Sequence, residues 1–320
     1  MRDLSSLRLQ MMSRLFLLLI LCTSCYRVPD KIEPQINYMV QDNYIKSLAA
    51  AFPPLTTVER NSSWGQEYTI GLAFARELDL YRAISTFKRA AILIPYKITD
   101  RRNEIDYFIL YCFYLGNKYR DVIDTFENSP LRQVTPQFPA YHDLLIILYE
   151  SYMKTEEPEK ANGILEIIDE TFPDTAKQLE LSTALSGGHI EALEQIRLED
   201  PSLSALMTSY AKEKKSIPRA QIYNAILPGA GYAYVGQKQS AFTAFTLNAL
   251  FIAAAVEFFR RGYIAAGIIT TTFESGWYFG GIYGAGESAK LYNERIYEKK
   301  AYALLGSEKH FPVLMLRYGF

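Results

Sequence analysis

Residues 64–95 read WGQEYTIGLAFARELDLYRAISTFKRAAILIP, and this stretch decides the fold. A small residue, Gly71, stands in its first half, and Ala83 stands in its second half with the aromatic Phe87 four positions later. Small side chains allow two antiparallel helices to approach closely, and an aromatic ring fills the space beside them. Pro95 cannot continue a helix, so it ends the unit. The stretch therefore predicts two packed antiparallel helices.

Two further stretches repeat the pattern. Residues 104–130 and 141–173 each predict a helix pair that ends at a proline. One position near the start of each second helix recurs every 39 residues, at Ala83, Val122 and Ala161. Even spacing of similar units is typical of a repeat protein, in which neighbouring units bury a shared core.

These units resemble the tetratricopeptide repeat, a helix pair with a period of about 34 residues. The small residues and the closing prolines carry the resemblance, while Glu67 stands where the family has a tryptophan. The additional residues are expected as longer loops at 96–103 and 131–140. A shorter helix pair at 179–197 and one helix at 201–215 would close the array. The resemblance implies an all-α array of stacked pairs.

Stacked helix pairs form a concave groove, which the first helix of each pair lines. By the same resemblance, those helices would present mostly tyrosines to it. Tyrosine combines a large contact area with a hydroxyl group and suits peptide recognition. The alternative is that these tyrosines pack against neighbouring helices. The candidate groove residues are Tyr68, Leu72, Tyr107, Tyr111, Tyr114, Glu150 and Met153.

The N-terminal residues have the pattern of an export signal. Arg14 precedes the apolar run 15–21, which is shorter than the about 20 residues that span a bilayer. The pattern resembles a bacterial lipoprotein signal peptide, although Cys22 stands where that family usually has leucine. The resemblance implies cleavage after Ser24 and a lipid on Cys25. A plain secretory signal cut after Ser24 and a short buried helix are the alternatives.

Composition argues against several functions. The formal net charge of −1 gives no basic face for nucleic acid. Of the three cysteines, only Cys112 lies beyond the export segment, so the exported chain would form no internal disulfide. The three histidines are far apart, and no HExxH or GxSxG motif occurs. We therefore expect no catalytic residues, no metal site, no cofactor and no enzyme activity.

An apolar segment begins at Ile217. Residues 241–259 and 262–286 are each long enough to cross a bilayer, with two arginines between them. Their many glycines and alanines would let two helices pack closely in lipid. The composition predicts a helical membrane hairpin within residues 217–297. A hairpin buried in protein is the alternative.

A proline–glycine turn opens this segment, with the sequence AILPGAGYAYVGQ. Proline stops the preceding helix, and the glycines permit a tight reversal. The turn resembles the opening of TM2-like membrane modules, and the resemblance implies membrane residence without a known reaction. A phosphate loop is the alternative, but no Gly-Lys-Ser/Thr follows. The residues of the turn motif are Pro228, Gly229, Gly231, Tyr234 and Gly236.

Three polar residues interrupt the apolar helices. Glu257 lies near a helix end and can reach the membrane interface, whereas Glu274 lies near the centre of its segment. A carboxylate at mid-membrane costs about 2.5–3.5 kcal/mol on insertion scales. We expect Glu274 to be protonated or to face the partner helix at Asn248. A polar pathway and an oligomer contact are the functional alternatives to a single interhelical hydrogen bond.

The sequence thus predicts an all-α chain with a tetratricopeptide-like array, a hydrophobic helical hairpin and a short C-terminal strand. The strand is expected because Leu314, Leu316, Tyr318 and Phe320 alternate with other residues, and it would dock on a partner or on its own domain. One strand cannot make a membrane barrel. The expected organisation is a signal peptide at 1–24, a linker at 25–60, the repeat domain at 61–200, a capping helix at 201–216, the membrane module at 217–297 and a tail at 298–320.

These features predict a non-enzymatic lipoprotein of the bacterial cell envelope that faces the periplasm and binds another envelope protein or peptide through its groove. Arg260 and Arg261 favour the inner membrane by the positive-inside rule, while Tyr26 leaves the outer membrane open. One rival is an outer-membrane assembly lipoprotein, by resemblance to the repeat-built partner of the barrel insertase. The other is a component of a small-molecule or lipid transport system. The partner and the oligomeric state stay open.

Overall fold

The computed structural model describes residues 28–38, 42–198 and 200–320, so the expected signal peptide and Cys25 lie outside the described residues. The described residues are mostly helical, which confirms the all-α class. They form two compact units. The tyrosine unit contains Ile36–Leu193 and Tyr302–Phe320, and the apolar unit contains the described residues up to Gln35 together with Glu194–Ala301.

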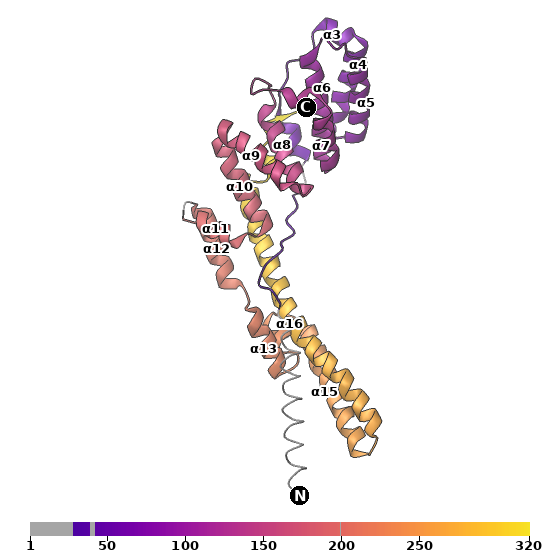
Figure 1. Cartoon of the computed structure of the whole chain (residues 1–320), viewed down its shortest axis with the longest axis vertical. Coiled ribbons are helices and arrows are strands. Elements are labelled where there is room, and N and C mark those ends of the chain that lie inside the picture. Colours follow the sequence, from indigo (N-terminus) through magenta and orange to yellow (C-terminus); the bar gives the residue numbers. More distant parts are fainter. Residues whose placement is uncertain (1–27, 39–41, 199) are drawn as a thin grey trace. The chain divides into compact units, whose positions relative to one another are not determined.

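In the tyrosine unit, each helix from α4 to α10 packs against the next one along the chain (Figure 1). Three expected helix pairs therefore exist as pairs of neighbouring helices. The bounds of the elements are α2 (Asp42–Ser47), β1 (Ala49–Ala50), α3 (Thr57–Asn61), α4 (Ser63–Arg76), α5 (Leu80–Leu93), α6 (Thr99–Leu115), α7 (Tyr119–Glu127), the 3₁₀ helix η2 (Pro130–Gln133), α8 (Tyr141–Lys154), α9 (Pro158–Thr171), α10 (Pro173–Gly187), α17 (Pro312–Met315) and β2 (Tyr318–Gly319).

Local residue chemistry explains the first helix pair. The Ser62 hydroxyl caps α4 by accepting from Gly65 N–H at 3.1 Å. The helices approach closely at Gly71, where an added Cβ would lie 2.8 Å from the ring of Phe87 on α5. Phe87 and Ala83 are fully buried. The small residues that predicted this pair thus stand where the two helices meet.

Three expected loops or linkers contain regular structure. The loop expected at 131–140 begins inside the 3₁₀ helix η2, which ends at Gln133. Helix α6 begins at Thr99, so the loop expected at 96–103 is shorter. The linker expected at 25–60 contains α2, β1 and α3, and α3 begins with a capping box between Thr56 and Glu59. The serine, threonine and carboxylate pattern of a capping box is a local signal for a helix start.

The C-terminal strand is present but short. Strand β2 pairs in parallel with β1, with Ala49 opposite Tyr318 and Ala50 opposite Gly319. Helix α17 precedes it, so Leu314 is helical although the alternation predicted a strand there. The strand therefore docks on its own unit.

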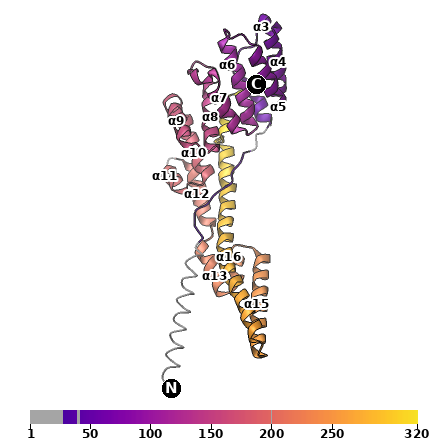
Figure 2. The same ribbon diagram turned by 45° about the vertical axis from the view of Figure 1, so that its right-hand side comes forward.

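In the apolar unit, α15 and the first part of α16 run side by side in both views (Figures 1 and 2). Gly262, with φ of 80°, lies in the turn between them. A small apolar core forms where α13 and α14 meet α16, around Ile217, Ala220 and Ala289. The bounds are α12 (Pro201–Glu213), α13 (Ile217–Ile226), α14 (Ala230–Tyr234) and α15 (Lys238–Arg260), while α11 (Ile190–Ile196) and α16 (Ile264–Ser307) contribute residues to both units.

Among the described residues, α15 is the one helix long and apolar enough to cross a membrane by length and composition. Helix α16 is longer but does not qualify, although residues 262–286 were expected to be a second span. The threonines 270–272 and the carboxyl group of Glu274 lower its apolar content. Helix α16 also continues to Ser307, so the tail expected from residue 298 begins inside a helix.

Candidate functional site

A segment of the chain itself occupies the tyrosine-rich surface of α6 and α8. We call Phe311–Phe320 the tail segment. The main-chain N–H groups of Arg317 and Tyr318 donate to the carboxylate of Asp143 at 3.0 and 2.9 Å. The hydroxyl of Tyr111 donates to the carbonyl oxygen of Tyr318 at 3.2 Å. Side chains of two helices therefore hold the backbone of the tail segment.

Aromatic packing fixes the last residue of the tail segment. The ring centroid of Phe320 lies 4.8 Å from that of Tyr111 and 5.7 Å from that of Phe108. Its main-chain oxygen accepts from Arg76 Nε of α4 at 3.3 Å. The surface thus recognises an extended backbone and an aromatic side chain together.

Asp143 is the central acceptor of this surface. Its side chain is 0% exposed, and Nδ1 of His142 lies 2.9 Å from its carboxylate. Nε2 of the same imidazole lies 3.1 Å from the Thr175 hydroxyl. A buried carboxylate needs such partners because burial removes its hydration. Sequence reasoning missed Asp143, although a carboxylate beside the apolar run LLIIL is an unusual core residue.

Three of the tyrosine candidates, on α4 and α6, face protein. Tyr68, Tyr107 and Tyr111 are at most 4% exposed. Tyr107 stacks on Tyr111 with a centroid distance of 5.8 Å and packs against Phe52. Leu72 is half-buried on α4. These positions are therefore closed to an outside ligand while the unit is folded as described.

A buried polar network surrounds Tyr68. Its hydroxyl donates to Glu104, whose carboxylate also lies 2.7 Å from Nη1 of Arg101. Nε of Arg101 lies 3.0 Å from Glu59. Burial raises the pKa of Glu104, whereas the hydrogen bond from Arg101 lowers the pKa of Glu59 to about 2. This network joins α3, α4 and α6 and gives Tyr68 and Glu104 their partners, whereas the Tyr107 hydroxyl of α6 has none among the described residues.

The remaining groove candidates, Tyr114, Glu150 and Met153, line a cavity of about 580 Å³ in the tyrosine unit. The hydroxyl of Tyr114 donates to Glu150, and burial raises the pKa of that carboxyl group. The start of the tail segment forms another wall. The cavity therefore continues the surface that holds the tail segment. Its other lining residues include Ile36, Asn37, Tyr38, Asn117, Tyr119, Tyr149, Lys154, Ser182, Thr183, Ser186, His189, Phe311, Pro312 and Val313.

Two glycines of the turn motif, Gly229 and Gly231, stand where another residue would be strained or would clash. Gly229 has φ of 93°, and its N–H donates to Oδ1 of Asn224 at 2.8 Å. A Cβ on Gly231 would lie 2.2 Å from the Ala220 oxygen. The hydroxyl of Tyr234 accepts from the main-chain N–H of Ser216, the residue before α13, at 3.1 Å. Together these contacts fasten α14 to α13.

The motif's other two positions complete this turn. Pro228 follows the last residue of α13 closely and lies directly before Gly229. Gly236 has φ of 85°, a conformation that glycine adopts without strain. The motif residues thus shape the backbone between α13 and α15.

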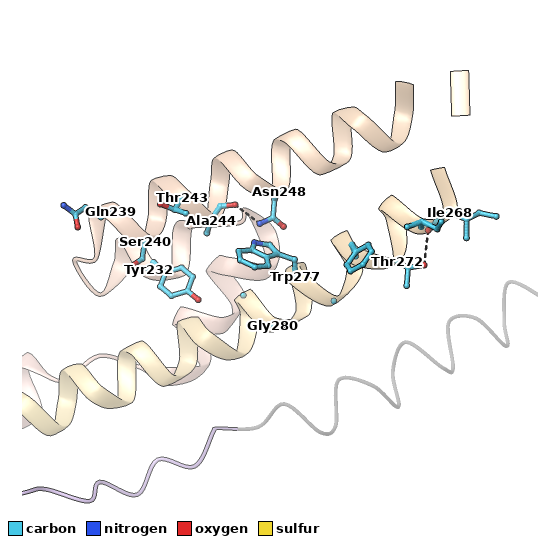
Figure 3. Close-up of a pocket in the computed structure, with 14 residues that line it drawn as sticks. Tyr232, Gln239, Ser240, Thr243, Ala244, Asn248, Ile268, Thr272, Trp277 and Gly280 are labelled. Carbon is cyan, nitrogen blue, oxygen red and sulfur yellow. Dashed lines mark hydrogen bonds between the residues drawn. The ribbon is translucent and has the colours of Figure 1, made fainter. Parts of the chain in front are cut away.

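A second cavity, of about 980 Å³, lies between α15 and α16 and is drawn in Figure 3. Asn248 of α15 lines it and is 4% exposed. Its Nδ2 donates to the Ala244 oxygen at 2.6 Å, but Oδ1 has no hydrogen-bond partner among the described residues. The lining residues are Tyr232, Gln239, Ser240, Thr243, Ala244, Asn248, Ile268, Ile269, Thr272, Phe273, Gly276, Trp277, Gly280 and Gly281.

The two carboxylates of this region differ. Glu274 is 8% exposed, and neither of its carboxylate oxygens has a partner among the described residues, so the expected hydrogen bond to Asn248 is not formed. Glu257 lies at the end of α15 as expected, with Nε of Arg261 2.6 Å from its carboxylate. Only Glu257 is thus neutralised by a neighbouring cation.

No group of metal-ligating side chains occurs within the described part of the chain. Cys112 is buried and unbridged, and burial raises the pKa of its thiol, which makes the thiolate scarce. Comparisons with family models, with curated proteins and with solved structures found no match for this chain.

Proposed function

We propose that this chain is a non-enzymatic lipoprotein of the bacterial cell envelope that binds an extended segment of another envelope protein through its tyrosine unit. The observation that carries this proposal is the capture of the tail segment by Asp143, Tyr111 and Arg76. Those side chains bind main-chain groups, which every extended peptide offers. The part of the tail segment that they hold contains strand β2, and a surface that holds one extended stretch is suited to hold another beside it.

A tetratricopeptide-like arrangement is part of this proposal. The close approach at Gly71 and the full burial of Ala83, Val122 and Ala161 support it. Each of these small or compact side chains lies where a repeat of this kind packs its two helices. Stacked pairs would then provide the concave surface that peptides use.

The cavity beside the tail segment is where we place the partner. Met153, which is half-buried, supplies contact area, and Glu150 supplies a carboxyl group that the buried Tyr114 holds in place through its hydroxyl. The partner would enter next to Pro312 and extend the contacts that the tail segment already makes. Binding there does not require the tail segment to leave.

Membrane attachment completes the proposal. We propose that a lipid on Cys25 and a hairpin of α15 and α16 hold the chain at a membrane, with the tyrosine unit in the periplasm. The apolar composition of α15 supports the hairpin. The proline–glycine turn, resembling that of TM2-like modules, supports it as well.

Site-directed photocrosslinking tests partner binding. A benzoylphenylalanine in place of Met153, in the lipidated chain within its own membranes, is expected to form a discrete adduct with one protein. The same residue in place of Gly163, on the exposed side of α9, is expected to form none.

A cavity-filling pair makes the test specific. Ser186→Trp fills the cavity and is expected to abolish the adduct, while Gly163→Trp places the same ring in open space and is expected to preserve it. An adduct that survives Ser186→Trp would refute binding in this cavity.

A further inference from the structure

We propose that the cavity between α15 and α16 binds one single-chain amphiphile, a molecule with an alkyl chain and a hydroxyl head group. The cavity measures about 980 Å³, within the range of small-molecule sites. It lies entirely in the apolar unit, so its occupancy is independent of partner binding by the tyrosine unit.

Polar lining residues extend from one end of the cavity to Asn248 in its middle. The far end is apolar apart from Thr272, whose hydroxyl donates to the Ile268 oxygen of its own helix. In Figure 3, Gln239, Ser240 and Tyr232 lie at one end and Ile268 lies at the other. Phe273 adds a further apolar side chain to the lining. An amphiphile has the same gradient, because its head group needs hydrogen bonds and its alkyl chain does not.

Asn248 supplies the specific contact for the head group. Its side chain points into the space between the helices beside Trp277 (Figure 3). Oδ1 has no donor among the described residues and is closed to water, which costs free energy until the side chain turns toward the cavity and a hydroxyl group donates to it. The hydroxyl of the amphiphile is the donor that this site lacks.

Hydroxyl groups of α16 do not meet this need. Thr270, Thr271, Thr272 and Ser275 each donate to the carbonyl oxygen four residues earlier in their own helix. A second copy of this helix would bring the same internally bonded hydroxyls. A small amphiphile with a free hydroxyl therefore fits the acceptor better than a second copy does.

Glycines create the volume of the cavity. A Cβ added to Gly276 or Gly280 would meet no atom within 4 Å, whereas one added to Gly267 would lie 2.7 Å from the Phe259 ring. Helix packing within the chain therefore requires glycine at position 267 but not at 276 or 280. At these two positions the missing side chain leaves its volume to the cavity.

The two tryptophans make the occupancy measurable. Trp277 lines the cavity, and Trp64 is buried in the tyrosine unit. With Trp64→Phe as the parent, Trp277 is the single tryptophan of the chain. We would place the full chain in lipid nanodiscs and titrate 9,10-dibromostearyl alcohol, whose bromines quench a tryptophan in contact.

The alcohol is expected to quench Trp277 in a saturable manner. The methyl ether of the same alcohol keeps the shape but lacks the donor, so it should require about tenfold more ligand, as expected for one hydrogen bond. Asn248→Leu should remove this difference. Equal quenching of the parent by alcohol and ether, or a difference that persists in Asn248→Leu, would overturn the assignment.

Cavity-filling variants separate binding from folding. Gly280→Leu should abolish saturable quenching while helix content and melting temperature are retained, because its added atoms enter empty space. Gly306→Leu, in the same helix outside the cavity, is the matched control and should quench like the parent. If both variants quench alike, or if Gly280→Leu instead breaks a dimer detected by crosslinking, the cavity does not hold an amphiphile.

Discussion

The two units differ in the partners of their buried carboxylates and in how much apolar surface they expose. In the tyrosine unit, the buried Asp143 and Glu104 have hydrogen-bond partners. In the apolar unit, Asn248 has an unpartnered oxygen while Phe242 and Leu250 are 71% and 61% exposed. Buried polar groups are normally paired, and exposed apolar patches normally mark an interaction surface. The tyrosine unit also buries unpartnered oxygens, on Tyr107 and Ser151, so the difference lies in the carboxylates and in the exposed surface. The buried carboxylate of Glu274 has no partner among the described residues, and the apolar side chains of α15 are exposed, from which we infer that the apolar unit is built for apolar surroundings.

The largest expected effect tests those surroundings directly. Phe245→Asp combined with Leu250→Asp places carboxylates at two exposed positions of α15. At about 2.5–3.5 kcal/mol each, they should lower the liposome partition coefficient by more than about a thousandfold. Flotation of a chain without residues 1–24 and with Cys25→Ser measures this without a lipid anchor.

The matched control makes the same change in the other unit. Tyr81→Asp with Ile92→Asp alters two side chains of α5 that are 83% and 81% exposed. That variant should float like the parent. If the two double variants partition alike, the contrast between the units would be wrong.

Asp143→Ala tests whether the tyrosine unit depends on its buried acceptor. Two main-chain N–H groups of the tail segment would lose their partner, which should lower the free energy of unfolding by about 2–5 kcal/mol. Hydrogen exchange should accelerate at the amides of Arg317 and Tyr318. Asp169→Ala, on the exposed side of α9, is the control, and unchanged protection in Asp143→Ala would refute the role of the carboxylate.

A smaller effect concerns pH. Burial raises the pKa of Asp106 to about 6, above the about 3.9 of an unfolded chain. The folded state holds that proton more tightly, so the stability that it contributes is complete below about pH 4 and is lost as the pH rises to about 6. Between pH 4 and pH 7, the free energy of unfolding of the Asp106→Asn variant should therefore fall by about 2–3 kcal/mol less than that of the parent chain.

Urea unfolding followed by Trp64 fluorescence, in a Trp277→Phe background, measures this difference. The other titrating groups contribute equally to the pH dependence of both chains, so their contributions cancel in the comparison. One of them is Glu59, whose lowered pKa makes the free energy of unfolding rise with pH from about 2 to about 4.5. Parallel pH profiles for the two chains would contradict the assignment to Asp106.

The smallest expected effect tests the close approach of α4 and α5. Gly71→Ala places a methyl group 2.8 Å from the Phe87 ring and should destabilise the tyrosine unit by about 1–2 kcal/mol. Gly163→Ala meets no atom within 4 Å and should stabilise it by up to about 1 kcal/mol. Urea midpoints measure both, and equal shifts would show that the small residue is not needed for packing.

The helices of the tyrosine unit were predictable because their signals are local. Gly71, Ala83 and Phe87 mark a close helix contact within a short stretch, and the structure places them there. The capping box of Thr56 and Glu59 is equally local and would have shown that the linker at 25–60 contains a helix. Local patterns of this kind need no knowledge of the rest of the chain.

The candidate site was predictable only in part. Tyr114, Glu150 and Met153 line a cavity, but Asp143 receives N–H groups 174 and 175 residues away. No local pattern encodes that pairing, because it depends on where the chain returns after α16. The burial of Tyr107 follows from the same folding of distant segments onto α6.

The way that Phe320 is held bears on how fusion proteins of this chain should be designed. Its side chain is 9% exposed, and its main-chain oxygen accepts from Arg76. Gly319 also tolerates no Cβ, which would lie 2.8 Å from the Ile45 oxygen. An epitope tag or reporter joined after Phe320 would have to leave from a closed position and would strain β2. The exposed turn at Tyr96 and Lys97, between α5 and α6, is the safer place for an insertion.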